Sequence, residues 1–226
     1  FKCRLKYILP CIFRNFKPAV KTVEFAKMNM WNDRYAQPGF LFGTDPARFL
    51  SDQKAYLKRG QKALAIADGE GRNSVYMAEK GMIVTAQDGS EMAIDKARGL
   101  AAGRGAKVDY QLADLKDWNW QPGEYDLAVA IFIQFAGPDF RDQIFTGLKK
   151  TLKKGGILLL HGYQPKQIAY GTGGPSVAEN LYTTDQLAEA FGDMEILRLE
   201  AYDREVQEGR GHSGMSALID LVARKI

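Results

Sequence analysis

Cysteine is nearly absent from this sequence, and its absence excludes two kinds of chemistry. Only Cys3 and Cys11 occur among 226 residues, and both lie within the first 27. The rest of the chain therefore has neither a disulfide nor a cysteine nucleophile, which suits a reducing compartment, and we expect a cytoplasmic protein. Long apolar runs are also absent. None approaches the roughly 20 residues that a membrane-spanning helix requires, so we expect no membrane partner.

An excess of basic charge is also absent from most of the chain. The net charge of +4 originates in residues 1–27, which hold seven bases and one acid, and this leaves 24 bases and 26 acids for the remainder. A nucleic-acid-binding body normally carries a basic face. We therefore expect no nucleic-acid partner.

Residues 1–29 form a basic N-terminal extension that we expect to lie outside the fold. Three interpretations of it stay open: upstream sequence read through from a misplaced start, which we favour, a targeting segment with few acids, or a basic surface-binding arm. Met28 and Met30 directly precede the first recognisable element. Residues 30–226 are then expected to form a single α/β domain with a sizeable core.

The stretch from Ala63 to Asp88 is the most informative part of the sequence. It has a short apolar run suited to a buried parallel strand, a turn rich in glycine at 68–71, a helical pattern over 72–80, and a second apolar run that ends in Asp88. This order is the βαβ unit that binds adenosine-containing cofactors. Glycines let the backbone approach the ligand, and an acid after the second strand accepts the ribose hydroxyls.

Strands and helices continue to alternate after this unit. We expect strands over 107–111, 125–131 and 156–160, and helices over 90–101, 138–153 and 184–191. The pattern predicts a doubly wound parallel sheet. Two final strand-like runs, 194–202 and 215–223, are separated by only about a dozen polar and glycine residues, so they must pair antiparallel. Before the first strand, Asp45 is expected to cap a helix that runs to about Arg59.

Two cofactors fit the glycine turn. Residues 69–74 form a degenerate dinucleotide motif that lacks its third glycine, which leaves a nicotinamide-dependent oxidoreductase as one interpretation. The antiparallel final pair and an acid after each of the first three strands, namely Asp68, Asp88 and Asp114, favour a different ligand. A nucleoside that carries an ammonium and a sulfonium suits acids where a pyrophosphate does not.

From about Trp31 to its end, the chain resembles the class I S-adenosylmethionine-dependent methyltransferases. It is most similar to the small bacterial tellurite-resistance and thiol-methyltransferase-like branch. The segments that carry the resemblance are WNDRYAQPGFLFGTDP, DGEGRNS, VTAQDGS, ADL, EYDLAVAIF, LKKGGILLL and EGRGHSGMSALIDLVARK. The resemblance implies a Rossmann-like methyltransferase fold with a mostly parallel sheet of order 3-2-1-4-5-7-6 and strand 7 antiparallel.

The resemblance also implies S-adenosyl-L-methionine as cofactor and S-adenosyl-L-homocysteine as its product, bound at the ends of the first four strands. The implied binding residues are Ala67, Asp68, Gly69, Glu70, Gly71 and Asn73 near the methionyl part, Asp88, Gly89 and Ser90 at the ribose and adenosine, Ala113, Asp114 and Leu115 at the adenine, and Ala130, Ile131 and Phe132 under the sulfonium. Asn73 is alternatively a residue that satisfies backbone donors of its own helix.

The chain departs from the family pattern at the first motif. The family carries an acid two residues before its first glycine, whereas this chain has Ala65 and Ala67 there. Asp68 is our candidate for the group that holds the methionyl amine. The departure also leaves a non-catalytic cofactor-binding relative as an alternative.

Methyl transfer is an in-line displacement, which needs an aligned nucleophile and excluded water. A small acceptor such as a thiol or metalloid oxyanion needs little base help, whereas an alcohol or amine needs a base. The base candidates are His161, His212, Glu205 and Glu208, of which the two histidines are our catalytic candidates. Substrate-pocket candidates are Trp31, Tyr35, Phe42, Tyr163 and Tyr170, although hydrophobic packing explains them equally well. We expect a monomer or a homodimer and no metal ion.

Overall fold

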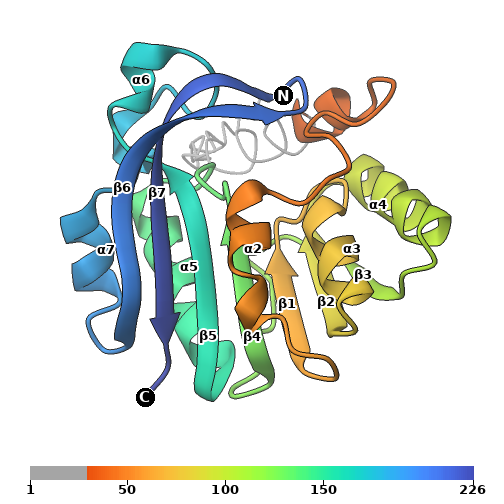
Figure 1. Ribbon diagram of the computed structural model, residues 1–226, viewed down its shortest axis with the longest axis horizontal. Coiled ribbons are helices and arrows are strands. Elements are labelled where there is room, and N and C mark those ends of the chain that lie inside the picture. The colour runs from red at the N-terminus through yellow and green to blue at the C-terminus, as the bar shows by residue number, and fades with distance from the viewer. Residues whose placement is uncertain (1–29) are drawn as a thin grey trace, which may run out of the picture.

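The computed structural model describes residues 30–226, and the interpretations of residues 1–29 lie outside this part of the chain. Helices cover both faces of one central sheet (Figure 1). The elements in chain order are α2 (Arg48–Asp52), η1 (Lys54–Tyr56), β1 (Lys62–Ile66), α3 (Arg72–Glu79), β2 (Ile83–Asp88), α4 (Glu91–Gly103), β3 (Val108–Leu112), β4 (Tyr125–Ile131), α5 (Pro138–Thr151), β5 (Leu152–Tyr163), α6 (Gln167–Tyr170), η2 (Ala178–Asn180), α7 (Thr184–Ala190), β6 (Glu195–Glu208) and β7 (His212–Arg224).

The sheet has seven strands in the order β3-β2-β1-β4-β5-β7-β6. β1 pairs in parallel with both β2 and β4, whereas β7 is antiparallel to β5 and to β6. This topology confirms the doubly wound, mostly parallel fold expected from the sequence. The strand order reverses between β1 and β4, so the carboxyl ends of these two strands define the crevice where such folds bind ligands.

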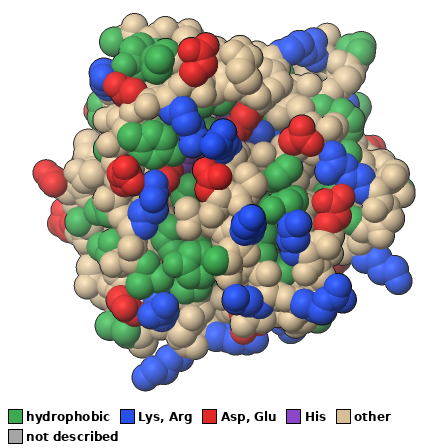
Figure 2. Space-filling model, viewed as in Figure 1, with side chains coloured by type: hydrophobic (Ala, Val, Ile, Leu, Met, Phe, Trp, Pro, Cys, Tyr) green, Lys and Arg blue, Asp and Glu red, His purple; other side chains and the backbone are tan. Residues whose placement is uncertain are grey.

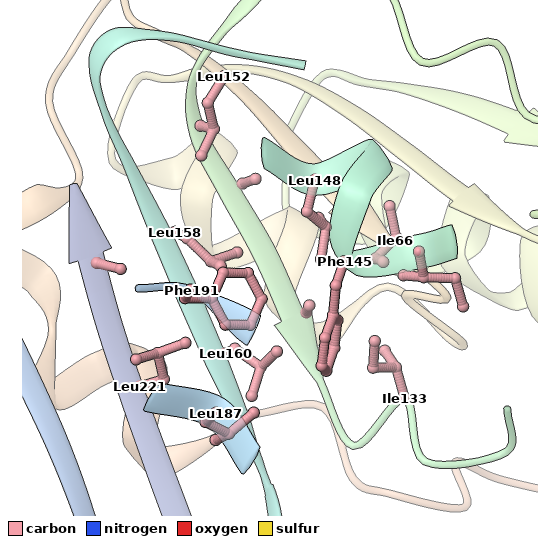
Figure 3. Packing of buried hydrophobic residues seen from close by; sticks show 14 of the residues in the cluster. Ile66, Ile133, Phe145, Leu148, Leu152, Leu158, Leu160, Leu187, Phe191 and Leu221 are labelled. Atoms are coloured by element: carbon pink, nitrogen blue, oxygen red, sulfur yellow. The ribbon is translucent and has the colours of Figure 1, made fainter. Parts of the chain in front are cut away.

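The two faces of the sheet carry separate hydrophobic cores. One core joins the sheet to α5 and α7 and contains Phe145, Leu148, Leu160 and Phe191 (Figure 3). The other joins the sheet to α2 and α3 and contains Phe49 and other buried apolar residues. Because successive strand residues point to opposite faces, Leu160 belongs to the first core while its neighbour His161 stacks against Phe49 on the second face.

Two local expectations are wrong. Helix α2 begins at Arg48 after Ala47, and it has no side-chain cap from Asp45. A residue distant in the sequence replaces the expected cap, because Asn73 Oδ1 accepts a hydrogen bond from the Ala47 N–H at 2.9 Å. The helix is also short and ends at Asp52.

The final hairpin is much longer than its apolar pattern predicts. β6 extends to Glu208 and β7 begins at His212, so a three-residue turn joins them rather than about a dozen residues. Both strands curve over the carboxyl edge of the sheet toward the segment before α2 (Figure 1). Among the described residues, no helix has the length and apolar character needed to cross a bilayer.

Candidate active site

Two residues with strained backbones mark the crevice. Ala67 follows β1 with φ of 46° and Phe132 follows β4 with φ of 56°, and these are the two non-glycine residues with positive φ in the described chain. Left-handed conformations of residues with a Cβ cost about 1–3 kcal/mol and cluster at ligand-binding sites. Both strained positions therefore lie where the topology already places the ligand.

Asp88 organises the loop that follows β1. Its Oδ2 accepts a hydrogen bond from the Gly69 N–H at 2.8 Å, and its Oδ1 accepts one from the Ser90 N–H at 2.8 Å. Burial raises the pKa of Asp88, and these backbone donors lower it. Ser90 Oγ then accepts from the Ala93 N–H and donates to Asn32 Oδ1. The acid after β2 thus holds the glycine loop in place, with lone pairs left for ligand hydroxyls.

Asp68 carries a carboxylate oxygen that is buried and has no hydrogen-bond partner. Oδ1 accepts from the Ser74 N–H at 3.3 Å, whereas Oδ2 is one of the few buried side-chain polar atoms of the described chain without a partner. Burial raises the pKa of Asp68 to about 7, and nearby Asp88 adds to the shift. A cation placed beside this oxygen would offset the cost of its burial.

Glu70 and Asn73 hold protein segments over the crevice. Glu70 Oε2 accepts from the Leu41 N–H at 2.7 Å, and its Oε1 pairs with Lys96 Nζ at 3.0 Å. Asn73 binds the start of α2. Both side chains therefore serve neighbouring segments, and the structure does not support the interpretation that Asn73 satisfies donors of its own helix.

The third strand end is linked to the second. Ala113 N–H donates to the Asp88 carbonyl at 3.1 Å, and the Ala113 carbonyl accepts from Gln87 Nε2. Asp114 is half-buried and accepts from the Lys116 N–H at 3.0 Å, while the side chain of Leu115 belongs to the core beside α5. Gly89 lies close to this pair of strand ends, since a Cβ there would approach the Ala113 carbonyl oxygen at 3.7 Å.

An aromatic cluster, formed by Phe42, Phe132, Tyr163 and His212, lies beside the end of β4. The Phe132 ring centroid is 4.1 Å from that of His212 and 4.8 Å from that of Tyr163. Phe42 lies 4.4 Å from His212. Burial lowers the pKa of His212 to about 3, and the positive charge of Arg72 adds to this shift. His212 is therefore neutral at physiological pH.

Two polar atoms of the aromatic cluster have no partner. Tyr163 Oη and His212 Nδ1 are buried without a hydrogen bond, and the two rings stand perpendicular with centroids 5.8 Å apart. Leaving a buried polar group unpaired costs about 1–3 kcal/mol, so such groups call for an explanation such as a ligand. Ala130 belongs to the core beside α5 and α7, and Ile131 belongs to the core beside α2 and α3.

Trp31 and Tyr35 adjoin the aromatic cluster from a helix rather than from the irregular loop that the sequence suggests. Residues 30–35 are helical. The i, i+4 spacing stacks the two rings at 5.5 Å, and Tyr35 meets Phe42 edge to face at 6.3 Å. Tyr35 is buried beside Gly69, because a Cβ on Gly69 would come within 2.9 Å of the Tyr35 hydroxyl. These aromatic residues therefore reach both the glycine loop and the aromatic cluster.

The turn between β6 and β7 packs against residues 41–43, next to the aromatic cluster. Gly211 N–H donates to the Leu41 carbonyl at 3.0 Å, and a Cβ on Gly209 would come within 2.5 Å of the backbone of residues 41–43. Glu208 forms a buried ion pair with Arg72 at 2.9 Å and accepts from the Arg48 N–H at 2.9 Å. The end of β6 is thus joined to the first turn of α3, next to the glycine loop.

Tyr170 and Glu205 are not brought to the aromatic cluster. Tyr170 donates to Asp203 Oδ2 at 2.9 Å beside Lys166, and Glu205 is exposed on β6. Only the glycine turn after Tyr170 approaches the cluster, because a Cβ on Gly173 would lie 3.3 Å from Tyr163 Oη. Of the five substrate-pocket candidates, four therefore gather at one place and Tyr170 lies apart.

His161 occupies a second buried polar group. Its Nδ1 is 2.7 Å from Asp220 Oδ1, and its ring lies between Phe49 and Phe132. Asp220 also accepts from Tyr202 Oη and from Arg198 Nε, both at 3.2 Å. Asp220 thus fixes the orientation of His161, and both histidine candidates contact the Phe132 ring, with centroid distances of 4.8 Å for His161 and 4.1 Å for His212.

Sequence reasoning missed several buried polar residues that shape this site. Gln134 accepts from the Tyr163 N–H at 2.6 Å and donates to the Tyr163 carbonyl at 2.7 Å, so it fixes the end of β5. Gln167 accepts from the Ala217 N–H at 2.8 Å and donates to the Gly173 carbonyl at 3.1 Å. A lone glutamine in a loop or short helix gives no sequence signal of such a role.

The described residues fit a cationic nucleoside cofactor. The unpartnered carboxylate oxygen of Asp68 suits an ammonium, and the Asp88 carboxylate at the end of β2 suits ribose hydroxyls. A pyrophosphate would instead meet two buried carboxylates, Asp68 and Asp88, at neighbouring strand ends. The chemistry of the available side chains therefore favours the ammonium-bearing ligand over a dinucleotide.

Asp68 is expected to make the stability of the protein depend on pH. Its pKa is about 7 in the folded protein and near 3.8 when unfolded. The folded state binds the extra proton between these values, so this group's contribution to stability falls as pH rises from about 4 to 7. Asp68→Asn should therefore raise the free energy of unfolding at pH 8 by about 2–4 kcal/mol and change it little at pH 4. Urea denaturation at both pH values measures the difference, and equal effects at both would contradict it.

The chain can be compared with known proteins once this geometry is established. Residues 63–156, or 94 of the 226 residues, match the model of a methyltransferase domain family. No curated protein sequence matches significantly.

Many solved structures share the fold. A structure reported for the conversion of a disulfide bond into a thioacetal group during echinomycin biosynthesis has a TM-score of 0.71 at 18% identity, over 88% of this chain and 92% of that one. TehB from Haemophilus influenzae has a TM-score of 0.65 at 19% identity, over 88% and 67% of the two chains. A SAM-dependent methyltransferase from Methanosarcina mazei has a TM-score of 0.64 at 19% identity, over 80% and 99%.

The strand order and the antiparallel β7 are those of the class I methyltransferase fold. Together with the match of residues 63–156 to a methyltransferase domain, they support an enzyme that transfers a methyl group from S-adenosylmethionine. This conclusion replaces the nicotinamide-dependent interpretation of the glycine turn.

Proposed function

We propose that this protein methylates a small, soft nucleophile, such as a thiol or a metalloid oxyanion, in contact with the aromatic cluster. The observation that carries the proposal is the pair of buried, unpartnered atoms Tyr163 Oη and His212 Nδ1, which offer hydrogen bonds to a bound acceptor. They lie beside Phe132, directly after the strained end of β4. The covering hairpin supports an acceptor of small size.

The low pKa of the His212 side chain supports an acceptor that needs no general base. An imidazole whose pKa is about 3 is a weak proton acceptor at neutral pH, and Arg72, which adds to that shift, is cationic. His212 then orients the acceptor by a hydrogen bond and Tyr163 orients it from the neighbouring strand, while Phe42 and Phe132 exclude water.

The cofactor supplies a methyl group on positive sulfur, and the chain's own residues bind and orient it. We assign Asp88 to the ribose hydroxyls, the 67–71 loop with Asp68 to the methionyl part, Ala113 and Asp114 to the adenine, and the backbone of 130–132 to the reacting end. Gly69, Gly71, Gly89 and Ser90 shape the backbone around these groups.

Two comparisons support the choice of acceptor. The structure with the highest TM-score of the three described above is reported for the conversion of a disulfide bond into a thioacetal group, which supports sulfur as the accepting atom. The similarity to TehB supports a place in the tellurite-resistance branch. We further propose that residues 30–226 act as one domain in the cytoplasm, as a monomer or a homodimer, without a nucleic-acid or membrane partner.

The pH dependence of the reaction tests this function. With a thiol acceptor, kcat/KM should rise with pH up to the pKa of the thiol, near 8.5, and show no inflection near 6.5. His212→Gln should lower kcat/KM about tenfold by loss of one hydrogen bond and leave the shape of this profile unchanged. Formation of S-adenosylhomocysteine with thiol, selenite, alcohol and amine acceptors provides the measurement.

His161→Gln is the matched variant, because it changes the other histidine beside Phe132. An inflection near 6.5 that disappears in one of the two variants would identify that histidine as a general base and would contradict the proposal. Tight binding of S-adenosylhomocysteine without turnover of any acceptor would instead favour the non-catalytic relative.

A further inference from the structure

A cavity of about 410 Å³ lies outside the cofactor loops, between α2 and the face of β6. Its lining includes Arg198, Glu200, Tyr202 and Arg204 from β6, which are even-numbered positions on one face of the strand. No part of the proposed methyl transfer uses these residues. Figure 2 shows basic and acidic side chains interspersed on this face of the molecule.

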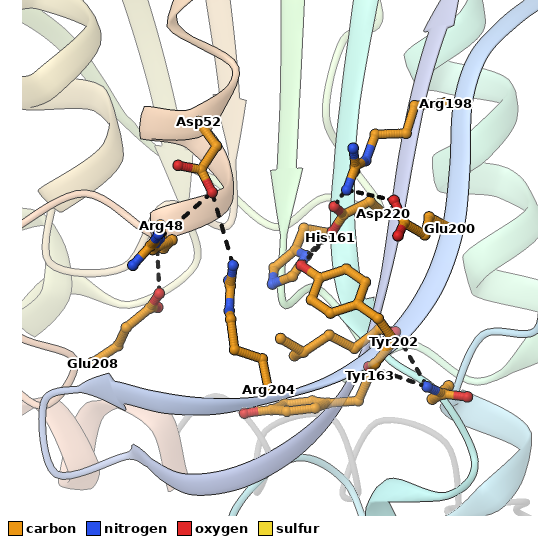
Figure 4. Close-up of polar contacts among 12 residues, drawn as sticks. Arg48, Asp52, His161, Tyr163, Arg198, Glu200, Tyr202, Arg204, Glu208 and Asp220 are labelled. Carbon is orange, nitrogen blue, oxygen red and sulfur yellow. Dashed lines mark hydrogen bonds and ion pairs between the residues drawn. The ribbon is translucent and has the colours of Figure 1, made fainter.

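The charges that line the cavity are divided between its two sides. On one side, Arg204 and Asp52 line the cavity, and the single carboxylate of Asp52 is approached by Arg204 at 3.8 Å and by the neighbouring Arg48, outside the lining, at 3.6 Å. Asp203 also lines the cavity, and its charge is paired with that of Lys166. On the other side, Glu200 and Asp220 both bind the single guanidinium of Arg198, at 2.7 and 3.2 Å. The first side therefore carries one net positive charge and the second one net negative charge (Figure 4).

On the positive side of the cavity, Arg204 can exchange its contact with Asp52 for a contact with a ligand. The 3.8 Å approach of Arg204 to Asp52 exceeds hydrogen-bond length, so the fork of donors is available to a carboxylate. The guanidinium also lies over the Tyr202 ring, 5.4 Å from its centroid, which holds its plane in position. The contact of Arg204 with Asp52 involves side chains that are 29% and 51% exposed, so a ligand carboxylate displaces it at little cost.

The negative side is anchored in the protein interior. The side chain of Asp220 is only 3% exposed, and Tyr202 and His161 hold its Oδ1. Glu200, in contrast, is about half exposed toward solvent and can turn to a cationic group of a ligand. The buried partner thus fixes Arg198 and leaves Glu200 as the adaptable carboxylate.

We propose that this cavity is a second binding site, for a small zwitterion of the α-amino-acid class. The ligand's carboxylate binds Arg204, its ammonium binds Glu200 beside Asp220, and its side chain lies against Tyr202 and Phe49, which also line the cavity. A ligand with a single charge forms an ion pair at only one side of the cavity and leaves the charge of the other side uncompensated. The site is independent of the acceptor site, although Asp220 links it through His161 to Phe132.

Calorimetric titration of the full chain tests this site. The protein is first saturated with S-adenosylhomocysteine, so that the cofactor site cannot take up the probes, and then titrated with each common L-amino acid. Propionate and propylammonium serve as single-charge probes. We expect at least one amino acid to bind with a millimolar or lower Kd and both single-charge probes to bind about tenfold or more weakly.

Arg204→Gln and Glu200→Gln should each weaken the amino acid's binding about tenfold. Both residues are partly exposed, so the variants should fold. Arg98→Gln, at an exposed ion pair on α4, is the matched control and should leave binding unchanged. Absence of binding by every amino acid, equal binding of propionate, or full binding by Arg204→Gln would each overturn the proposal. None of these outcomes depends on methyl transfer, so they leave the proposed activity to its own test.

Discussion

Asp88→Ala should lower the affinity for S-adenosylhomocysteine by about 100-fold. We expect the carboxylate to accept two ribose hydroxyls, and hydrogen bonds to a charged group contribute about 1.5–3 kcal/mol each. The structure adds a second consequence. The Gly69 and Ser90 N–H groups lose their acceptors, so the glycine loop itself should lose order and the protein should lose stability.

Asp88→Asn separates the two effects, because asparagine keeps one acceptor oxygen while it removes the charge. Its affinity loss should remain at least tenfold, with a smaller loss of stability than in Asp88→Ala. Asp109→Asn on β3, where Gln111 binds the carboxylate in solvent, is the matched control. Calorimetry with S-adenosylhomocysteine measures the affinity, and an unchanged Kd in folded Asp88→Asn would exclude the ribose assignment.

Arg72→Met should destabilise the protein by about 3–5 kcal/mol. The side chains of Arg72 and Glu208 are only 7% and 13% exposed, so the substitution leaves a carboxylate buried without its cation. The loss should also release the hairpin turn from α3, since Glu208 joins β6 to both Arg72 and the start of α2. Urea denaturation followed by circular dichroism measures the change in unfolding free energy.

The double variant Arg72→Met/Glu208→Gln should recover most of this loss, because glutamine is neutral and still accepts from the Arg48 N–H. Arg48→Met provides a comparison at an ion pair whose side chains are 69% and 51% exposed, and it should cost less than about 1 kcal/mol. Equal losses in Arg72→Met and Arg48→Met would show that the buried pair has no special role.

Local patterns were sufficient for the topology. Ser90 caps α4 as expected, with its Oγ accepting from the Ala93 N–H, and Gly81 ends α3 with φ of 84°. Apolar runs bounded by such signals identify strands and helices because each signal acts within a few residues. The antiparallel final pair followed from the short connection, which cannot accommodate a parallel crossover.

The polar half of the hairpin was missed for a physical reason. Apart from Val206, residues 203–208 carry charged and polar side chains, yet they pair with 212–217 through their backbone. Apolar periodicity detects a strand only where several residues of one face are apolar, and here Val206 alone joins a small buried cluster with Tyr163 and Leu218. The extension matters because it brings His212 and Glu208 over the end of β4.

The sequence by itself determined the order of the elements, the glycine loop and the acids after the first three strands, and its resemblance to the class I methyltransferases indicated the class of enzyme. Those features depend on short-range periodicity and on the rule that parallel strands end at one edge. Only the tertiary structure decided which side chains meet: Asn73 with the start of α2, Arg72 with Glu208, and His161 with Asp220. These partners lie 26 to 136 residues apart, and the packing of the sheet against its helices, which no local pattern encodes, selects them.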